Sequence, residues 1–275
     1  MSNEFLRCID GLESLSIIKE GLYKDTYRCL YKGRRSILSH YRIDNNPFNL
    51  DPKREFNLLN SIEGIILTPE PLFYDDESKI LIVTEIEGEH ISQLKDRQSL
   101  LSDLAKRLNS LHSYPVDDFD HTFRDTLMAY GRQMEQEDEK NIFKAAIDLH
   151  DALSDEAGKN CLCHNDLHPE NALVGEQIKF IDWEYASLNL SCFDLAYAME
   201  HFEMNEDETV YFMSEYGITA QDIDFKTIKK SQKLVRYVTL IWLLILSKYY
   251  TMNPSEMKLM TSLKIELNEK ELWQK

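Results

Sequence analysis

The sequence predicts an α+β fold with two lobes: a small N-terminal lobe with an antiparallel sheet and one main helix, and a larger, mainly helical C-terminal lobe. Three observations lead to this prediction. Short runs rich in β-branched and aromatic residues, separated by turn residues, dominate roughly the first 85 residues. After Gly88, apolar residues recur at helical spacing. The 275 residues, 43% of them hydrophobic, suffice to bury the cores of two lobes, which we place at residues 1–86 and 87–275.

The N-terminal lobe is expected to contain a series of strands and one helix. Gly21 separates the first two strand-like runs, and Gly33 with Arg34 marks a hairpin between the second and the third. Asp51 followed by Pro52 is typical of a helix start, with aspartate as the N-cap and proline at the first helical position. The strands are expected at residues 14–20, 26–32, 36–41, 71–74 and 79–85.

The C-terminal lobe is expected to be helical except for one island at residues 162–184. Within this island, two short strand-like runs lie at 172–174 and 177–181. Thr219 with Asp222 resembles a capping box. Because clefts between lobes are favoured ligand sites, we expect the functional site where the island meets the N-terminal lobe. Helices are expected around 101–111 and at 122–133, 139–157, 192–203, 206–216, 225–250 and 254–271.

The acidic composition narrows the class of function. The chain has 31 Lys and Arg against 48 Asp and Glu, a formal net charge of −17. A protein that binds nucleic acid by neutralising phosphates is normally basic or carries a basic stripe, so we expect no nucleic-acid partner. An acidic surface attracts cationic small molecules, whereas ATP would need metal ions or local positive charge. Alternatively, the charge serves solubility alone.

The cysteines and the apolar stretches predict a cytoplasmic protein without membrane insertion. Five cysteines, an odd number without a C-x-x-C motif, argue against a disulfide framework. The N-terminal residues lack the basic and apolar regions of a secretory signal. The longest apolar stretch, residues 238–246, is much shorter than the roughly 20 residues needed to cross a bilayer. The oligomeric state stays open.

Three polar residues of the island predict a magnesium-dependent phosphoryl transfer. Asp166 and Asn171 lie five residues apart around Pro169, which breaks a regular helix, so both side chains can point into a cleft from a fixed loop. Eleven residues later, after a hairpin, Asp182 can return to the same place. Carboxylate and amide oxygens suit Mg²⁺. The remaining carboxylate, Asp166, is then free to accept a proton from an attacking hydroxyl.

The island also resembles a known enzyme group. The pattern H-x-D-x-x-x-x-N at 164–171, followed by I-D-W-E at 181–184, resembles the signature of small-molecule kinases with a protein-kinase-like fold: choline, ethanolamine and thiamine kinases and aminoglycoside phosphotransferases. Residues 184–196 resemble the E-Y-A-x-x-N-x-x-x-F-D-L-A spacing of choline and ethanolamine kinases, and thiamine kinases share its start. The resemblance spans essentially the whole chain, although its specific motifs lie within 163–196. It implies that Asp194 is a structural acceptor for the catalytic loop.

Carried over by position, the resemblance implies the residues that act in catalysis. Asp166 would be the catalytic base, and Asn171 and Asp182 would be the magnesium ligands. His164 would organise the catalytic loop from a buried position, and His168 would lie near the transferred phosphate. ATP and Mg²⁺ are the implied cofactors.

The acceptor is expected to be a small cationic alcohol. By the resemblance, Glu184 would lie near a second metal ion or near the substrate. Trp242 and Tyr249, with Tyr237 and Tyr250, could form an aromatic cage for a quaternary ammonium or a thiazolium, where cation–π attraction contributes on the order of 0.5–2 kcal/mol. Aromatic residues on helices also serve simply as core, and that alternative stays open.

The strand cation of the family is missing from this sequence. Glu55 matches the helix glutamate that normally pairs with a strand lysine or arginine, although it could also be a surface residue. Ser39 stands where the resemblance places that cation, and a one-residue register slip would present His40 instead. Because a serine cannot neutralise a phosphate, either Arg42 or Lys24 substitutes or the affinity for nucleotide is reduced.

Two further segments are assigned to the nucleotide. The run that starts at Gly21 and includes Lys24 resembles the short turn that covers the phosphates in this family. Residues 82–86, before Gly88, resemble the interlobe hinge, where backbone groups of Glu85 and Ile86 would bind an adenine. A plain edge strand would have the same pattern.

A zinc site is the main competing interpretation of the island. Cys161, Cys163, His164 and His168 lie close together in sequence, but they lack the paired spacing of zinc knuckles, and neighbouring strand residues point to opposite faces. The sequence therefore favours buried structural cysteines. No role is predicted for the remaining histidines His90, His112, His121, His150 and His201.

The leading hypothesis is an ATP- and Mg²⁺-dependent kinase for a hydroxyl of choline or ethanolamine, with thiamine second. An aminoglycoside phosphotransferase is the alternative within the class. The missing cation at Ser39 also permits a non-catalytic nucleotide-binding protein. A metal-dependent hydrolase built on His164, Asp166 and His168 is a third interpretation.

Overall fold

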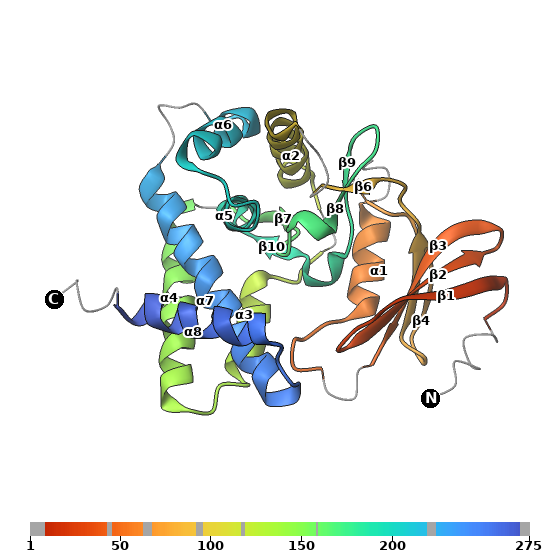
Figure 1. Ribbon diagram of the computed structural model, residues 1–275, viewed down its shortest axis with the longest axis horizontal. Coiled ribbons are helices and arrows are strands. Elements are labelled where there is room, and N and C mark those ends of the chain that lie inside the picture. The colour runs from red at the N-terminus through yellow and green to blue at the C-terminus, as the bar shows by residue number, and fades with distance from the viewer. Residues whose placement is uncertain are drawn as a thin grey trace.

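An antiparallel sheet with one helix forms the N-terminal lobe of the computed structural model, which describes residues 9–42, 46–62, 68–91, 96–116, 119–157, 159–218 and 224–269 (Figure 1). The sheet order is β1-β2-β3-β5-β4. In the β2/β3 pair, Lys24 lies opposite Tyr41 and Thr26 lies opposite Ser39. The strands are β1 (Leu12–Glu20), β2 (Lys24–Tyr31), β3 (Arg34–Tyr41), β4 (Pro71–Asp75) and β5 (Ile80–Thr84).

The helix of this lobe, α1 (Pro52–Ser61), lies between the sheet and the C-terminal lobe (Figure 1). The Asp51 carboxylate accepts a hydrogen bond from the Lys53 amide at 3.0 Å and caps the helix, as its sequence predicts. The helix packs on β4 and β5 and also contacts the turn at Trp183–Tyr185. It therefore links the sheet to the island.

The C-terminal lobe is built around the long helix α7, which contacts helices α3, α4, α5 and α8. Its inward face carries aliphatic residues that are almost fully buried, such as Leu240 and Ile245. Within the described ranges, no helix is both long enough and apolar enough to cross a membrane. The helices are α2 (Arg97–His112), α3 (Phe123–Gly131), α4 (Glu137–Ala157), α5 (Ser191–His201), α6 (Glu206–Tyr216), α7 (Phe225–Tyr249) and α8 (Pro254–Glu269).

Short strands form the island between the lobes. Two of them, β8 and β9, were predicted from the sequence, whereas the equally short β7 and β10 and the two-residue β6 were not. One small sheet has the order β6-β8-β9, and a second pairs β10 with β7. The strands are β6 (Glu89–His90), β7 (Cys161–Cys163), β8 (Ala172–Val174), β9 (Ile178–Phe180) and β10 (Ser187–Asn189).

The predicted α+β fold is confirmed, because the sheet precedes a mainly helical lobe and the helical ranges agree within a few residues at most ends. The lobe boundary at residues 86 and 87 stays a prediction, and it falls between β5 and β6. The capping box predicted at Thr219 and Asp222 lies outside the described residues.

Candidate active site

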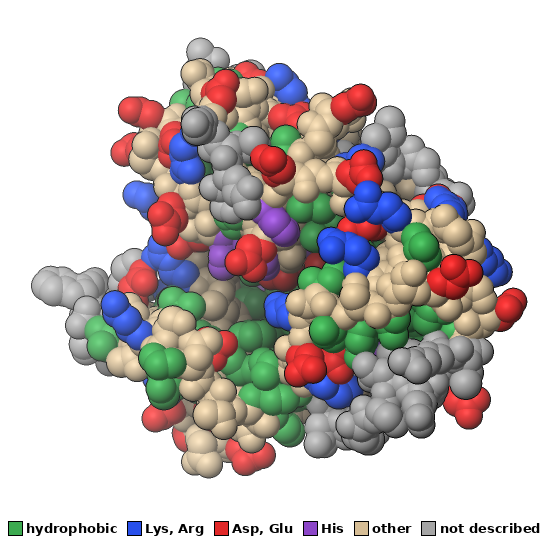
Figure 2. Space-filling model, turned by 45° about the vertical axis from the view of Figure 1, so that its right-hand side comes forward, with side chains coloured by type: hydrophobic (Ala, Val, Ile, Leu, Met, Phe, Trp, Pro, Cys, Tyr) green, Lys and Arg blue, Asp and Glu red, His purple; other side chains and the backbone are tan. Residues whose placement is uncertain are grey.

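A cavity of about 640 Å³ lies between the sheet and the island. Its volume is in the range of small-molecule sites, roughly 300–1,000 Å³. Thr26 and Ser39 line it from the sheet, and Asn171 and Asp182 line it from the island. Figure 2 shows a hollow between the two halves of the molecule, with acidic and histidine side chains beside it. The cavity therefore joins the sheet to two of the residues assigned to Mg²⁺.

Asp166 lies beside this cavity with donors at both carboxylate oxygens. Tyr197 donates its hydroxyl to Oδ1 at 2.6 Å, and Asn171 donates its Nδ2 to Oδ2 at 3.0 Å. His168 Nε2 lies 3.7 Å from the same Oδ2. His168 Nδ1 accepts the Glu170 amide at 3.2 Å, which leaves Nε2 as the ring nitrogen that faces Asp166. Burial raises the pKa of Asp166.

The loop that carries Asp166 is fixed by Asp194. One carboxylate oxygen of Asp194 accepts the His164 amide and the other accepts the Asn165 amide, both at 2.7 Å. The His164 ring donates its Nε2 proton to the Ile181 carbonyl at 2.9 Å. Burial lowers the pKa of His164, so the imidazole is neutral. His164 and Asp194 thus lie where the sequence places an organiser and a structural acceptor.

Asn171 and Asp182 offer oxygens that fit a hard cation. The Asn171 amide nitrogen donates to the Asp166 carbonyl at 2.9 Å as well as to its carboxylate, so the amide oxygen points elsewhere. Asp182 has left-handed backbone angles, φ 66° and ψ 64°. Such a conformation is uncommon for a non-glycine residue and occurs preferentially at functional sites. Both side chains line the cavity.

Lys24, at the start of β2, crosses the cleft to the acidic residues of the island. Its ammonium donates to Asp182 Oδ1 and, at 2.6 Å, to Glu184 Oε2. Tyr41, opposite Lys24 in the sheet, donates to Glu55 at 2.6 Å and lies 3.4 Å from Glu184 Oε2. Glu55 is therefore a buried member of the site and not a surface residue.

The charges of this cluster depend on one another. Burial and the neighbouring Asp182 charge raise the pKa of Glu184 to about 8. Although burial disfavours its charge, the Lys24 ammonium keeps the pKa of Asp182 below its usual range. Burial also opposes the charge of Lys24, but Asp182 and Glu184 outweigh it and raise the pKa of the ammonium. Lys24 is thus a permanent cation between two carboxyl groups.

The structure distinguishes the two candidate substitutes for the missing strand cation. Ser39 lines the cavity together with Lys24. Arg42 instead bonds to Asp25 at 2.9 Å and to the Gly21 carbonyl, with 44% of its side chain exposed, and it is not among the cavity-lining residues. A Cβ atom on Gly21 would lie 2.3 Å from the Lys24 carbonyl, so the turn before β2 requires glycine.

Glu85 and Ile86, the predicted hinge residues, line the same cavity. The Glu85 amide donates to the Arg35 carbonyl at 3.0 Å. The Glu85 carboxylate binds Arg28 at 2.7 Å and Arg35 at 3.0 Å. An adenine at this place would therefore meet the Glu85 carbonyl and the Ile86 backbone.

Trp242 reaches the site from α7 through a chain of hydroxyl groups. Its indole nitrogen donates to the Tyr185 hydroxyl at 3.1 Å, which lies 3.1 Å from the Tyr23 hydroxyl. Tyr23 in turn donates to Glu184 at 3.0 Å. Phe48 stacks on Trp242 with ring centroids 5.2 Å apart. Aromatic rings and one buried carboxyl group thus lie side by side.

Of the other aromatic residues assigned to the cage, Tyr249 is turned to the exposed side, whereas Tyr237 and Tyr250 belong to the same apolar core as Trp242. Tyr249 is 43% exposed and donates to Gln133 at 2.7 Å, and Tyr237 is buried in the helical core. Tyr250 is partly buried against the same core. Sequence reasoning missed Tyr197, although its spacing of three from Asp194 on one helix places both on one face.

The two-lobed fold has a cleft between the lobes, and Asp166 is held by Asn171 and Tyr197 next to it. These features define a kinase-like phosphotransferase. A model of the phosphotransferase enzyme family matches residues 14–215, and the chain belongs to this family. It is a small-molecule phosphotransferase, so the resemblance found in the sequence is confirmed.

Relatives in sequence and in structure agree with this assignment. The protein LicA homolog of Mycoplasma capricolum subsp. capricolum is 24% identical over 212 residues, which cover 74% of this chain and 84% of the relative. The choline kinase LicA from Streptococcus pneumoniae has the same fold, with a TM-score of 0.75, 18% identity and 97% of each chain covered. A LicA structure in complex with AMP gives a TM-score of 0.73 at 17% identity, over 97% of this chain and 96% of that one.

Proposed function

We propose that this chain is an ATP- and Mg²⁺-dependent kinase that phosphorylates the hydroxyl of choline or ethanolamine, with thiamine as the second candidate. The observation that carries the proposal is that Asn171 and Asp182 line the same cleft as the Glu85–Ile86 segment, with Asp166 hydrogen-bonded to Asn171 at 3.0 Å. The choline kinase named among the structural neighbours supports the choice of acceptor.

In this proposal ATP lies along the cleft, with its adenine at the hinge and its phosphates toward the island. The Asn171 amide oxygen and the Asp182 carboxylate would hold Mg²⁺, which when bound offsets the charge of the phosphate oxygens. Asp182 is engaged by Lys24, so nucleotide binding must reorganise that ion pair. Lys24 would then turn to the phosphates and supply the positive charge that Ser39 lacks.

Asp166 is the proposed acceptor of the hydroxyl proton. Tyr197 and Asn171 hold its two oxygens in fixed directions, which leaves the remaining lone pairs for the incoming hydroxyl. As the oxygen attacks the γ-phosphorus in line with the leaving ADP, its proton passes to Asp166. His168, whose Nε2 lies 3.7 Å from Asp166 Oδ2, would donate to an oxygen of the transferred group.

The cationic end of the acceptor is assigned to the group of Trp242, Tyr185 and Glu184. Rings of this kind attract quaternary ammonium ions through their faces, and the Glu184 carboxyl is joined to them through the Tyr23 hydroxyl. Tyr249 is left out because it bonds to Gln133 on the exposed side of α7.

A substrate panel tests this function. ADP release would be measured with choline, ethanolamine, thiamine and kanamycin in the presence of Mg²⁺, for the wild type and for Asp166→Asn. We expect choline or ethanolamine to give the highest kcat/KM, and the variant to lose roughly 10²- to 10⁴-fold in turnover. Preference for kanamycin would favour the aminoglycoside alternative. A flat panel despite ATP binding would favour the non-catalytic alternative, and full activity of Asp166→Asn would contradict the role of the base.

A further inference from the structure

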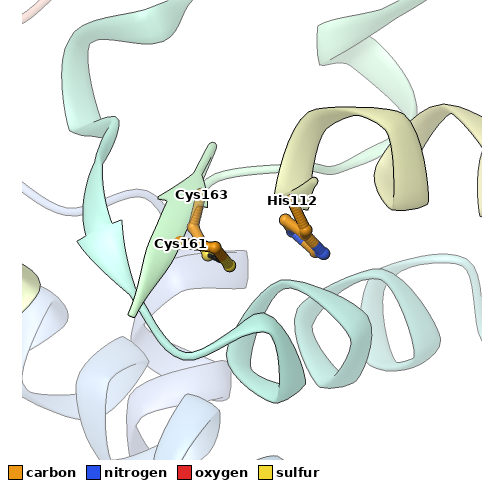
Figure 3. A group of neighbouring side chains, drawn as sticks. All are labelled: His112, Cys161 and Cys163. Carbon is orange, nitrogen blue, oxygen red and sulfur yellow. Dashed lines mark hydrogen bonds between the residues drawn. The ribbon is translucent and has the colours of Figure 1, made fainter. Parts of the chain in front are cut away.

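Two cysteines and one histidine form a second cluster, and none of the three lines the cleft. Cys161 and Cys163 lie on β7, and His112 lies at the end of α2, which packs against that strand. Figure 3 shows the three side chains gathered between the strand and the helix. One ligand atom from each residue lies within 4.8 Å of the other two. The mechanism proposed above uses none of them.

The spacing of the thiols fits a tetrahedral metal. The two Sγ atoms are 3.7 Å apart. Two zinc–sulfur bonds of about 2.3 Å at a tetrahedral angle place the sulfurs about 3.8 Å apart. A zinc-bound nitrogen and sulfur lie about 3.6 Å apart. The ring nitrogen of His112 must therefore move about 1 Å closer to the two Sγ atoms to bind the same ion.

The surroundings of His112 resemble those of a metal-bound histidine. Its Nδ1 lies 2.8 Å from the Tyr216 hydroxyl, and its Nε2 lies 3.2 Å from Asp194 Oδ2. With Nδ1 turned to the thiols, Nε2 keeps Asp194 as its oxygen partner, and such partners orient metal-binding histidines. His112 is 3% exposed, whereas Cys161 is partly exposed, so an ion and a water molecule can enter beside Cys161.

We propose that His112, Cys161 and Cys163 bind one thiophilic divalent cation such as Zn²⁺, with water at the fourth position. Two thiolates and an imidazole select Zn²⁺ over Mg²⁺, which prefers oxygen ligands. The cysteines give up their protons to solvent as the metal–sulfur bonds form. The site is therefore distinct from the Asn171–Asp182 pair in both place and chemistry, and it does not depend on the proposed kinase substrate.

This site would act on the catalytic loop through Asp194. That carboxylate contacts His112 and also holds the amides of His164 and Asn165. A metal ion that fixes His112 therefore also fixes the support of the loop. Sequence reasoning combined the two cysteines with His164 and His168, but the alternation of β7 turns both thiols toward α2, so the third ligand comes from a distant helix.

Cobalt binding tests the proposal on the full chain. Cys8, outside the described residues, is replaced by serine in every protein so that its thiol does not interfere. We expect one Co²⁺ per chain with the intense near-ultraviolet absorption of cobalt–thiolate bonds, displaced by Zn²⁺. Cys161→Ser and His112→Gln should lose it, whereas Cys29→Ser, a change at a thiol buried in the N-terminal sheet, should keep it. Cobalt bound without thiolate absorption, or an unchanged band in Cys161→Ser, would overturn the proposal.

Two measurements on the protein without substitutions at the site keep the test valid if a variant fails to fold. Zn²⁺ should protect the partly exposed Cys161 thiol from a thiol reagent, because this cysteine becomes a ligand. At about 100 times its dissociation constant, Zn²⁺ should raise Tm by about 5 °C. Mg²⁺ should give no thiol protection. Equal thiol reactivity with and without Zn²⁺ would refute the site even if kinase activity is normal.

Discussion

Replacing Lys24 with methionine tests the cluster at the centre of the cleft. The substitution keeps the length of the side chain and removes a cation that contacts both Asp182 and Glu184. Lys24 is 14% exposed and Glu184 is 4% exposed, so the carboxyl groups left behind are poorly solvated. Removing one partner of a buried ion pair costs roughly 3–5 kcal/mol. We expect about 3 kcal/mol, at the low end, because Asp182 is 33% exposed and Glu184 can take up a proton.

Urea unfolding at pH 7, followed by circular dichroism, measures this loss of stability. Lys53→Met, at an exposed position in the first turn of α1, is the matched control and should change stability by less than about 0.5 kcal/mol. Millimolar Mg²⁺ should raise the Tm of Lys24→Met more than that of the wild type, since the ion replaces the missing charge. The KM for ATP should rise by roughly 10-fold or more. A loss below about 1 kcal/mol would refute the assignment of Lys24 as the charge that holds the cluster together.

Three further changes address single groups of the site. Asp182→Ala should abolish Mg²⁺-dependent nucleotide binding in a calorimetric titration, and unchanged binding would exclude Asp182 as a ligand. The pKa of Glu184, about 8 in the fold against an ordinary 4.5, makes the folded state bind the extra proton, so the stability of the wild type should fall between pH 4.5 and 8 relative to Glu184→Gln. At about 1.4 kcal/mol per pH unit, the loss of unfolding free energy from this group is at most on the order of 5 kcal/mol. If the unfolding free energies of the wild type and Glu184→Gln, measured in urea, changed equally from pH 5.5 to 8.5, the assignment would be contradicted. Because the hydroxyl of Tyr197 lowers the pKa of Asp166, Tyr197→Phe should move the acid limb of the kcat profile to higher pH, and an unmoved limb would remove that role.

Features set by neighbouring residues were predictable from the sequence. The start of α1 follows from Asp51 and Pro52 alone, and the motif from His164 to Asn171 places its polar groups on one short loop. Counting from the Gly33 hairpin, the resemblance put Ser39 at the position of the strand cation, and Ser39 lines the cleft. In each case the interactions that decide the structure lie within a few residues along the chain.

Features that depend on distant segments were not predictable. Lys24 bonds to residues 158 and 160 positions away, and no periodic pattern links them. Whether Lys24 or Arg42 replaces the missing strand cation depends on which of the two faces the island. Arg42 bonds instead to Asp25 and to the Gly21 carbonyl. The partnership of His112 with Cys161 likewise requires α2 to pack on β7.

The pairing of β6 with β8 fixes the position of the chain after Gly88 relative to the island. Glu89 pairs with Val174 immediately after the hinge, and a Cβ atom on Gly88 would lie 3.0 Å from the Val174 carbonyl. From Gly88 onward, the chain therefore moves with the strand that follows Asn171. If the sheet lobe rotates, the change in backbone angles falls before Gly88, so the reach of Lys24 changes while Glu89 keeps its place beside Val174.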